Sequence, residues 1–299
     1  MILVAGGTGN LGTVLVRRLT DRRMPVRVLT REPARAGHLA SRLVEVVQGD
    51  VRDPGSLTHA VAGVDTVVSA IHGFSGRNDV SPDSIDRDGN RHLVDAASSV
   101  GAAFILVSIV GAAADSPIDL FRAKHAAERY VQQSGLRWTI VRATAFIETW
   151  AKVMGTPLIT NGRTMVFGRG DNPINFVSAA DVAALLDLAV VDENLRGQVI
   201  ELGGTENISF NQLATMIQQA GGRSGAVRHI PRAMLRAIAT LMRPFNPGLA
   251  RHARAAIVMD TRDMAFDALP TRRAFPDLPN TDLAGALEQW FAKHRDDMR

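Results

Sequence analysis

Short apolar runs alternate with amphipathic stretches through the first half of the chain. After the opening run at residues 2–5, further runs typical of buried strands occur at 26–29, 43–47, 66–70, 104–107 and 139–141. Between most of them the apolar positions recur with helical spacing; in 11–19, for example, residues 11, 14, 15, 16 and 19 are apolar. This alternation of strands and helices predicts an α/β protein with a doubly wound parallel sheet.

The rhythm changes after residue 147. Segments rich in Gly, Pro and Asn follow at 155–157, 161–162 and 168–173, and they predict loops and short strands. We therefore expect a sheet domain at 1–147 and a smaller capping region at 148–299 that binds the substrate. Residues 174–192 are expected to return and pack on the first domain.

Three later helices have recognisable patterns. Capping boxes formed by Ser178 and Asp181, and by Ser209 and Gln212, precede the apolar stretches 182–191 and 213–220. We interpret Asp181 as a helix cap and not as a catalyst. Residues 231–242 predict an amphipathic basic helix on the domain surface, with a lid, a partner interface or a membrane-surface contact as alternatives.

Composition excludes several classes of protein. The chain has no cysteine, so disulfides, thiolate metal sites and cysteine nucleophiles are absent, and no His/Asp/Glu cluster has the spacing of metal ligands. Of its 34 basic residues, 31 are arginines scattered along the chain, and the net charge is only +4, which argues against a nucleic-acid partner. No apolar run reaches the roughly 18 to 20 residues of a membrane span, and the first strand leaves no room for a signal peptide. We expect a cytoplasmic protein and infer no particular oligomeric state.

A glycine-rich turn, Gly-Gly-Thr-Gly-Asn-Leu-Gly, directly follows the first strand and opens the first helix. A pyrophosphate requires backbone N–H groups at close range and the positive end of a helix, and residues without a Cβ atom permit that approach. This context predicts a dinucleotide cofactor bound by the loop. The expected cofactor-binding residues here are Gly6, Thr8, Gly9, Asn10, Leu11 and Gly12.

The end of the second strand lies about twenty residues beyond these glycines, where the adenosine ribose is expected. The sequence there is Thr30-Arg31-Glu32. An arginine forms charge-assisted hydrogen bonds with a 2′-phosphate, whereas an acidic residue accepts from free ribose hydroxyls and repels phosphate. Arg31, followed by Arg35 one helical turn later, favours NADP(H) over NAD(H), and Glu32 favours the opposite choice.

Two further strand ends carry candidate cofactor contacts. After the third strand, Asp50 could accept from the adenine amino group while Val51 flanks the ring, or Asp50 could cap a turn. After the fourth strand, the backbone of Ser69, Ala70 and Ile71 is expected to pass the ribose and nicotinamide.

These motifs occur in one order along the chain, and they continue with Val107-Ser108-x-x-Gly111-Ala112, Lys124 and Val141-Arg142. The chain resembles the NmrA-like branch of the atypical short-chain dehydrogenases/reductases over about residues 1–220, most strongly before 147. The resemblance implies an NAD(P)-binding Rossmann domain. It also implies that the glycine loop holds pyrophosphate, that Arg31 meets the 2′-phosphate and that Gly49-Asp50 contacts adenine.

Ordinary short-chain dehydrogenases use a Tyr-x-x-x-Lys pair, and this chain has none. Its only tyrosine is Tyr130, four residues before Ser134, and Leu120 stands where the family tyrosine would be. Lys124 matches the family lysine, so the resemblance implies a ligand of the cofactor ribose. An exposed helix lysine is the alternative.

Reduction without the tyrosine requires another source of a proton. The candidate catalytic residues are Lys124, Ser108, His125 and His72, with water as a further alternative. Ser108 matches the strand-end serine of the family, which orients a carbonyl oxygen, although a serine there could also form a turn. Both histidines have a suitable unperturbed pKa but could be structural.

Three functions are compatible with these residues. The first is an NADPH-dependent oxidoreductase acting on an apolar carbonyl, enone or quinone, for which Phe74, Phe146, Trp150 and Phe167 would supply an aromatic environment if they do not simply pack in the core. The second is a non-catalytic NADP(H)-binding redox sensor. The third, a sugar epimerase or dehydratase, is weakened by the missing tyrosine.

Overall fold

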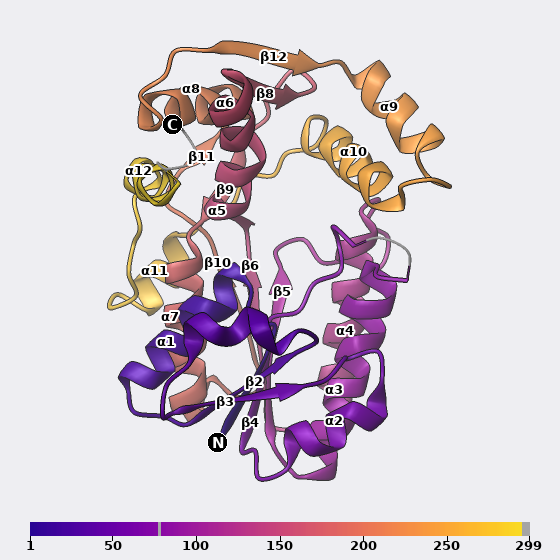
Figure 1. Cartoon of the computed structure of the whole chain (residues 1–299), viewed down its shortest axis with the longest axis vertical. Coiled ribbons are helices and arrows are strands. Elements are labelled where there is room, and N and C mark those ends of the chain that lie inside the picture. The colour runs from indigo at the N-terminus through magenta and orange to yellow at the C-terminus, as the bar shows by residue number, and fades with distance from the viewer. Residues whose placement is uncertain (77–78, 295–299) are drawn as a thin grey trace. The chain divides into compact units, whose positions relative to one another are not determined.

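The computed structural model describes residues 1–76 and 79–294 of the chain (Figure 1). Its contacts divide the chain into two compact units. The first comprises Met1–Arg142 and Val182–Glu201, and the second Ala143–Asp181 and Leu202–Arg299. The domain division expected after residue 147 stays a prediction. The first residue that contacts assign to the second unit lies a few residues earlier, at Ala143.

The first unit is built on a seven-stranded sheet with the order β10-β6-β5-β4-β1-β2-β3. Its strands are β1 (Ile2–Ala5), β2 (Val26–Thr30), β3 (Val44–Gln48), β4 (Thr66–Ser69), β5 (Ala103–Ile109), β6 (Trp138–Ala143) and β10 (Gln198–Leu202). Its helices are α1 (Asn10–Asp21), α2 (Pro54–Val61), α3 (Asp88–Ser99), α4 (Asp119–Gln133) and most of α7 (Ala179–Val191), with short turns η1 (Pro33–Leu39), η2 (Pro82–Arg87) and η4 (Glu193–Leu195). The expected Rossmann architecture is confirmed.

The order of the strands reverses at β1. Strand β1 pairs in parallel with β2 on one side and with β4 on the other, so that Ile2 stands beside both Val26 and Thr66. In doubly wound sheets, ligands bind outside the carboxyl ends of the strands at such a switch point. The ends of β1 and β4 therefore mark the position of the site.

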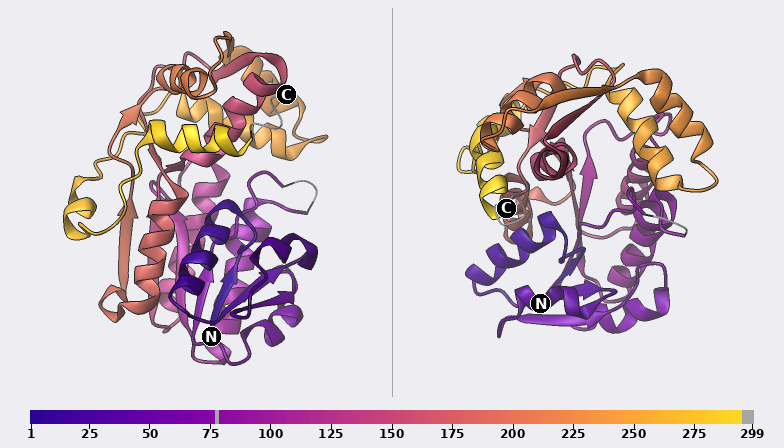
Figure 2. Two further views of the ribbon diagram at one scale, coloured as in Figure 1. Left: turned by 60° about the vertical axis from the view of Figure 1, so that its left-hand side comes forward. Right: turned by 45° about the horizontal axis from the view of Figure 1, so that its top comes forward.

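Helices cover both faces of this sheet (Figure 2). Leu3 and Phe104 face a core that also contains Leu57 of α2 and Leu93 of α3, and all four side chains are inaccessible to solvent. Leu15, on α1, is equally buried. Because both faces are covered, the strands are almost continuously apolar, which is why they could be recognised in the sequence.

The second unit contains two small sheets and several helices. Its strands are β7 (Ala145–Phe146), β8 (Arg163–Phe167), β9 (Ile174–Val177), β11 (Asn207–Ile208) and β12 (Ala226–Ile230), arranged as β11-β9-β7 and β12-β8. Its helices are α5 (Ile147–Trp150), η3 (Ala151–Gly155), α6 (Thr156–Asn161), α8 (Phe210–Ala220), α9 (Arg232–Leu241), α10 (Pro247–Met259), α11 (Leu269–Ala274) and α12 (Leu283–Lys293). Among the described residues, no helix is long and apolar enough to cross a membrane.

One of the two expected capping boxes forms, and the other does not. At α8, Ser209 and Gln212 make the reciprocal pair of hydrogen bonds. At α7, the Ser178 hydroxyl accepts from the N–H of Ala180, but the carboxylate of Asp181 accepts from Arg272 Nη2 at 2.6 Å and from the N–H of Thr281 at 3.2 Å. Asp181 is therefore a buried anchor for the segment near α11, and its interpretation as a cap is corrected.

Candidate functional site: the carboxyl ends of the first-unit strands

The glycine loop between β1 and α1 is held by close backbone contacts. Gly6 has a φ of +86°, and a Cβ atom there would lie 2.6 Å from the carbonyl oxygen of Ala70. A Cβ atom at Gly12 would overlap the carbonyl oxygen of Gly6. The loop is closed by the Gly9 N–H, which donates to Gly6 O at 3.0 Å. Glycine is therefore required at position 6 by both conformation and space, and at position 12 by space.

The N-terminus of α1 suits an anion. Gly9 occupies the N-cap position, no side chain caps the helix, and its first turn contains no acidic residue. Thr8 is half-buried, Asn10 is exposed and the Leu11 side chain packs in the core, so Leu11 would contribute its backbone. Uncapped N–H groups and the helix dipole together form the environment that a pyrophosphate requires. The loop thus fits the predicted cofactor group.

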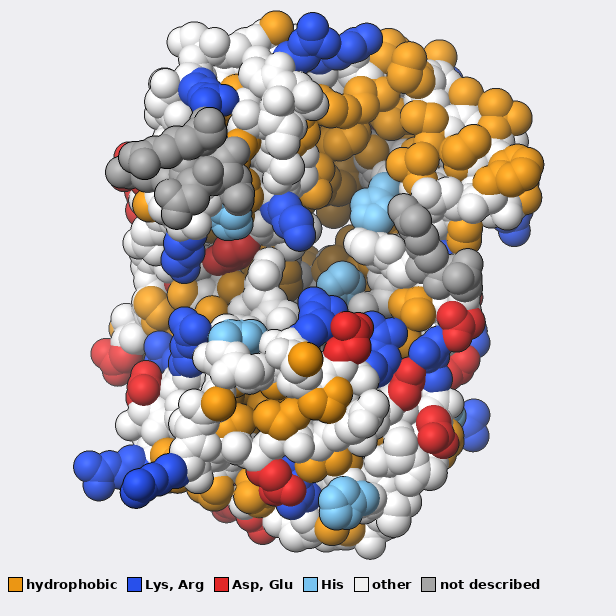
Figure 3. Space-filling model, in the orientation of Figure 1, with side chains coloured by type: hydrophobic (Ala, Val, Ile, Leu, Met, Phe, Trp, Pro, Cys, Tyr) orange, Lys and Arg blue, Asp and Glu red, His pale blue; other side chains and the backbone are white. Residues whose placement is uncertain are grey.

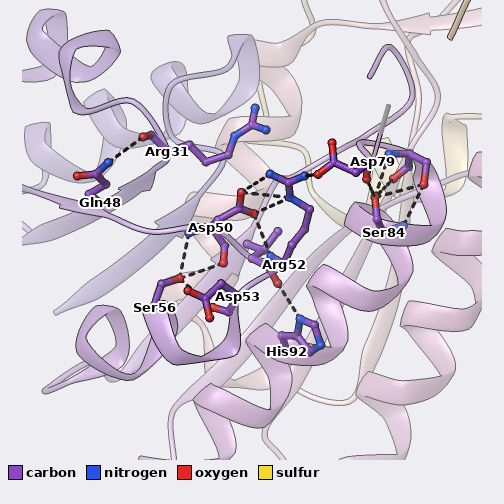
Figure 4. A network of polar contacts seen from close by, with 11 residues as sticks. Arg31, Gln48, Asp50, Arg52, Asp53, Ser56, Asp79, Ser84 and His92 are labelled. Carbon is purple, nitrogen blue, oxygen red and sulfur yellow. Dashed lines mark hydrogen bonds and ion pairs between the residues drawn. The ribbon is translucent and has the colours of Figure 1, made fainter. Parts of the chain in front are cut away.

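Two arginines lie at the neighbouring ends of β2 and β3 (Figure 4). Arg31 is exposed, and its guanidinium forms no hydrogen bond or ion pair with the residues that the structure describes. Arg52, which the sequence analysis did not select, holds Asp50 through its Nε at 3.0 Å and its Nη2 at 2.5 Å. Arg52 also forms an ion pair with Asp79.

This ion pair changes the charge at the ends of β2 and β3. The side-chain hydrogen bond from Arg52 is the main reason that the pKa of Asp50 is lowered, and Arg31 adds a smaller attraction. Asp50 is therefore a paired carboxylate, and Glu32 lies 4.0 Å from Arg35. Asp50 shares Arg52 with Asp79, and the guanidinium of Arg31 forms no hydrogen bond or ion pair with a described residue, so it is available to a ligand.

A buried polar chain organises the end of β4. The Ser69 hydroxyl donates to Asn90 Oδ1 at 2.6 Å, and Asn90 Nδ2 donates to the carbonyl oxygen of Asp86 at 2.7 Å. The Ala70 N–H donates to Ala5 O at 2.9 Å, which extends the β1–β4 pairing beyond the strand. Val51 is buried, and its carbonyl contacts His92 Nδ1 at 2.8 Å. These contacts fix the backbone at the switch point.

Lys124 is buried within the first unit, where its ammonium group has three neighbouring oxygen atoms. Its side chain is 6% exposed, and its Nζ donates to the carbonyl oxygens of Ile71 and Val107, both at 3.0 Å. The third neighbour of Nζ is Asp86 Oδ1 at 3.0 Å, and Asp86 is itself completely buried. The two carbonyl oxygens accept hydrogen bonds from Nζ, whereas Asp86 Oδ1 is a charge partner that accepts no hydrogen bond. Lys124 is thus not an exposed helix lysine, and it ties α4 to η2 and to the ends of β4 and β5.

Ser108 belongs to a second buried polar network, which also involves helix α4. Its hydroxyl donates to Glu128 Oε1 at 2.5 Å, and Glu128 accepts from Arg142 Nε at 2.8 Å and Nη2 at 2.7 Å. Arg142 also contacts Glu201 at 3.0 Å. The bonds to Glu128 raise the pKa of Arg142 above its ordinary value. The hydroxyl of Ser108 therefore already donates its hydrogen bond to another residue of the protein.

The remaining candidates differ in how their polar atoms are satisfied. His125 follows Lys124 on α4, and its Nδ1 is buried with no hydrogen-bond partner among the described residues. His72 is exposed and has an interaction partner. Tyr130 donates to Asp95 Oδ1 at 2.6 Å, which raises the pKa of the tyrosine and ties its hydroxyl to α3. Tyr130 is accordingly a surface contact between two helices.

The aromatic residues expected near a substrate are partly explained by packing inside the second unit. The ring of Trp150 lies 4.6 Å from that of Phe210 and 6.2 Å from that of Phe167. Phe74 and Phe146 are half-buried.

An open cleft of about 820 Å³ in the second unit is lined by Phe266, Arg272 and neighbouring residues, and none of the predicted site residues borders it.

Several site residues were missed from the sequence: Arg52, Asp86, Asn90 and Glu128. A signal for Glu128 existed, because it stands four residues after Lys124 on the same face of α4. Both side chains are buried at 5% or less relative exposure. Polar residues at core-facing helix positions mark buried networks, since an unpaired polar group there is costly.

Within the described residues, no group of three His, Asp or Glu side chains is arranged to hold a metal ion, and the expected absence of a metal stays a prediction.

The fold and the glycine loop together define a dinucleotide-binding protein of the Rossmann class. The chain belongs to the NAD(P)H-binding family, whose sequence model matches residues 6–193. It is 30% identical to the NAD(P)H azoreductase of Xenophilus azovorans over 224 residues, which cover 75% of this chain and 74% of that protein. It is 25% identical to quinone oxidoreductase 2 of Escherichia coli K12 over 97% of this chain and 99% of that protein.

A solved structure has the same fold. The NADPH-dependent quinone oxidoreductase of Escherichia coli, crystallised with NADPH, superimposes with a TM-score of 0.78 over 97% of this chain and 100% of that chain, at 22% identity. The similarity therefore extends through both units of the chain.

Proposed function

We propose that the protein is an NADPH-dependent oxidoreductase that transfers hydride to an apolar small molecule, namely a carbonyl, enone or quinone, without a Tyr-x-x-x-Lys pair. The observation that carries this proposal is the uncapped glycine loop at the start of α1, combined with the exposed guanidinium of Arg31, which forms no hydrogen bond or ion pair with a described residue. The names of two relatives, an azoreductase and a quinone oxidoreductase, support the reductase chemistry. A cytoplasmic location, a small-molecule substrate, no nucleic-acid partner and membership of the NmrA-like branch are parts of the proposal.

Different residues at the strand ends would bind different parts of the cofactor. Backbone N–H groups from Gly6 to Gly12 would bind the pyrophosphate, and Arg31 would bind the 2′-phosphate. Asp50 and Val51 would border the adenine, and Ser69 to Ile71 would border the ribose and nicotinamide. The bound cofactor would supply the hydride. We propose that Lys124 positions the backbone at Ile71 and Val107, with a direct bond to the ribose as its alternative role.

We assign proton delivery to His125. Its buried Nδ1 has no partner within the described residues, whereas the proton of Ser108 is donated to Glu128 at 2.5 Å. An imidazole is the side chain that most often serves as a general acid or base. Ser108 and His72 are the alternatives, and water is a further one.

The second candidate function is a redox sensor that binds NADP(H) without turnover. It is favoured by one observation, namely that the hydroxyl of Ser108 and two N–H groups of Lys124 already donate hydrogen bonds within the protein. A sensor needs the cofactor site and no proton donor. A turnover assay therefore separates the two functions.

The proposed activity predicts NADPH oxidation with at least one class of apolar acceptor. Purified protein would be mixed with NADPH and a panel of quinones, enones, azo dyes and aldehydes, and absorbance of NADPH would be followed. We expect turnover with quinones or azo dyes, reduced at least roughly tenfold in His125→Asn with NADPH affinity unchanged. Tight NADPH binding without turnover on the whole panel would replace the reductase with the sensor.

The proposed cofactor preference predicts a selective effect at Arg31. In Arg31→Ala, the affinity for NADPH falls by about 1.5–3 kcal/mol, or roughly 10- to 100-fold, because a charge-assisted contact with the 2′-phosphate is lost. The affinity for NADH, which lacks this phosphate, changes little. Calorimetric titration with each cofactor measures both values.

Arg42→Ala is the matched control for this experiment. Arg42 is also exposed, it lies before the start of β3, and its loss changes the net charge equally. We expect unaltered NADPH affinity in this variant. Equal losses of NADPH and NADH affinity in Arg31→Ala would contradict the assignment to the 2′-phosphate.

A further inference from the structure

Strands β8 and β12 form a small parallel sheet in the second unit, and one of its faces is open to solvent. On β8, Thr164 and Val166 are buried, whereas Arg163 is exposed and Met165 is half-buried. Because side chains alternate between the two faces of a strand, positions 163 and 165 both lie on the open face. The strand pairing places Arg228 of β12 beside Met165, so Arg228 shares this face with Arg163.

A pocket of about 330 Å³ opens on this face, and Arg163 and Arg228 both line it. Its other lining residues within the described part of the chain are Pro157 and Asn161 of α6 and Met165 of β8. The volume lies at the lower end of the range of small-molecule sites. Two arginines from different strands therefore border one small cavity.

Contacts on the other side of the small sheet hold its two strands together. Gln218 of α8 donates through Nε2 to Gly225 O at 2.8 Å, just before β12, and to Thr164 Oγ1 of β8 at 3.3 Å. A Cβ atom at Gly225 would lie 2.4 Å from Gly162 O, so a glycine is needed where the two strands begin side by side. Residues outside the pocket therefore fix the backbone that carries its two arginines.

The charges of these two arginines are not neutralised by the chain. Neither Arg163 nor Arg228 forms a hydrogen bond or an ion pair with a residue that the structure describes. Residues 149–170 and 207–259, which contain α6, β8, α8 and β12, include no Asp or Glu. In Figure 3, blue Lys and Arg side chains lie along the top of the view, where Figure 1 places β8 and β12. Two like charges beside one cavity repel each other, and an anion bound between them attracts both.

We propose that this pocket binds a phosphate group, carried by a small organic molecule or free as inorganic phosphate. A phosphate dianion matches the charge of two guanidinium groups, and the planar fork of arginine donates paired hydrogen bonds to phosphate oxygens. The amide of Asn161 supplies a further donor. Pro157 and Met165 offer apolar contacts to an attached organic group. This inference goes beyond the proposed reductase activity and does not depend on it, because none of the proposed cofactor-binding residues lines the pocket.

Two other anions fit the pocket less well. A monocarboxylate has a single negative charge and would leave one guanidinium without a partner. A nucleic-acid strand is bound through aromatic stacking as well as phosphate contacts, and none of the described lining residues is aromatic. A compact dianion complements both the charge and the size of the pocket.

The test is calorimetric titration of the full chain with three probes: glucose 6-phosphate, inorganic phosphate and glucose. We expect saturable binding of glucose 6-phosphate and no binding of glucose, because the phosphate carries the charge that the pocket recognises. Tighter binding of glucose 6-phosphate than of inorganic phosphate supports an organic phosphate as the ligand, with contacts to Pro157 and Met165. Equal affinities of these two probes support free phosphate as the ligand.

Substitutions in the pocket locate the bound phosphate. Arg163→Gln and Arg228→Gln should each weaken the binding of glucose 6-phosphate by roughly tenfold or more, because each removes charge-assisted hydrogen bonds. Asn161→Asp keeps the shape of the side chain but places a carboxylate in the pocket, so it should weaken binding similarly. The matched control R236Q/R254Q removes two exposed arginines of α9 and α10 outside the pocket and should bind like the wild type. Thermal midpoints check the folding of every variant.

A further variant separates this pocket from the proposed 2′-phosphate site, since Arg31→Ala should bind glucose 6-phosphate like the wild type. The proposal is overturned by any of three results. The first is that the wild type binds neither glucose 6-phosphate nor inorganic phosphate. The second is that the control R236Q/R254Q loses as much affinity as Arg163→Gln and Arg228→Gln. The third is that Arg31→Ala abolishes binding while the pocket variants retain it, which would assign the phosphate to the first unit.

Discussion

Replacing Lys124 by methionine lowers the free energy of unfolding by about 3–5 kcal/mol, because it leaves the completely buried carboxylate of Asp86 without its cation. Methionine keeps the aliphatic stem and removes the charge. The variant also loses the bonds to Ile71 O and Val107 O, so the end of β4 is no longer tied to α4. Urea denaturation measures the loss of stability, and titration with NADPH measures the accompanying loss of affinity.

A double variant separates the charge from the packing. In K124M/D86N both charges are absent, so we expect part of the lost stability to return relative to K124M alone. The matched control is Lys152→Met, the same substitution at an exposed lysine, which should change the stability by less than about 0.5 kcal/mol. Unchanged stability in K124M would show that the ammonium group does not neutralise Asp86, and the positioning role would be wrong.

The sequence predicts the fold of the first unit well because its physical signals are local. Strand β2 (Val26–Thr30) and strand β5 (Ala103–Ile109) were recognised as apolar runs, and each is extended by only one to three residues in the structure. Buried parallel strands have apolar side chains on both faces, so they form uninterrupted runs. The short strands of the second unit have no such pattern. Strand β11, with two residues, is defined by its pairing with β9 and not by its own sequence.

The site was predicted unevenly for a related reason. The glycine loop was recognised because its glycines lie close together in the sequence, between an apolar strand and the start of a helix. The partners of Lys124 come from positions 71, 86 and 107, and only the tertiary structure brings them together. The pairing of Asp50 with Arg52 is local, but its consequence for Arg31 depends on the adjacency of β2 and β3. Long-range polar partners leave little trace in one sequence.

Helix α4 explains how a site without a catalytic tyrosine stays ordered. Lys124 and Glu128 lie one turn apart on its buried face, and they hold the ends of β4, β5 and β6 through Ile71, Ser108 and Arg142. The buried lysine and glutamate each cost desolvation energy, which is offset because their charges and hydrogen-bonding atoms are paired. Lys124 therefore has a structural role that needs no tyrosine at position 120.

The largest effect on cofactor binding is expected from Gly12→Ala. A Cβ atom at this position overlaps the carbonyl oxygen of Gly6 and lies 2.6 Å from the Cα atom of Gly7, so the glycine loop must move away from α1. Because the proposed pyrophosphate site consists of backbone N–H groups in this loop, NADPH affinity should fall by roughly 3 kcal/mol, or more than about a hundredfold. Calorimetric titration measures the affinity, and NADH should lose as much, since both cofactors contain the pyrophosphate.

Gly37→Ala provides the control for that substitution, and the comparison tests the geometry of the loop itself. A Cβ atom at Gly37 would meet nothing within 4 Å, so this variant should bind NADPH like the wild type. Equal losses of NADPH and NADH in Gly12→Ala, against the selective loss in Arg31→Ala, would separate pyrophosphate binding from 2′-phosphate binding. Wild-type affinity in Gly12→Ala would contradict the assignment of the pyrophosphate to this loop.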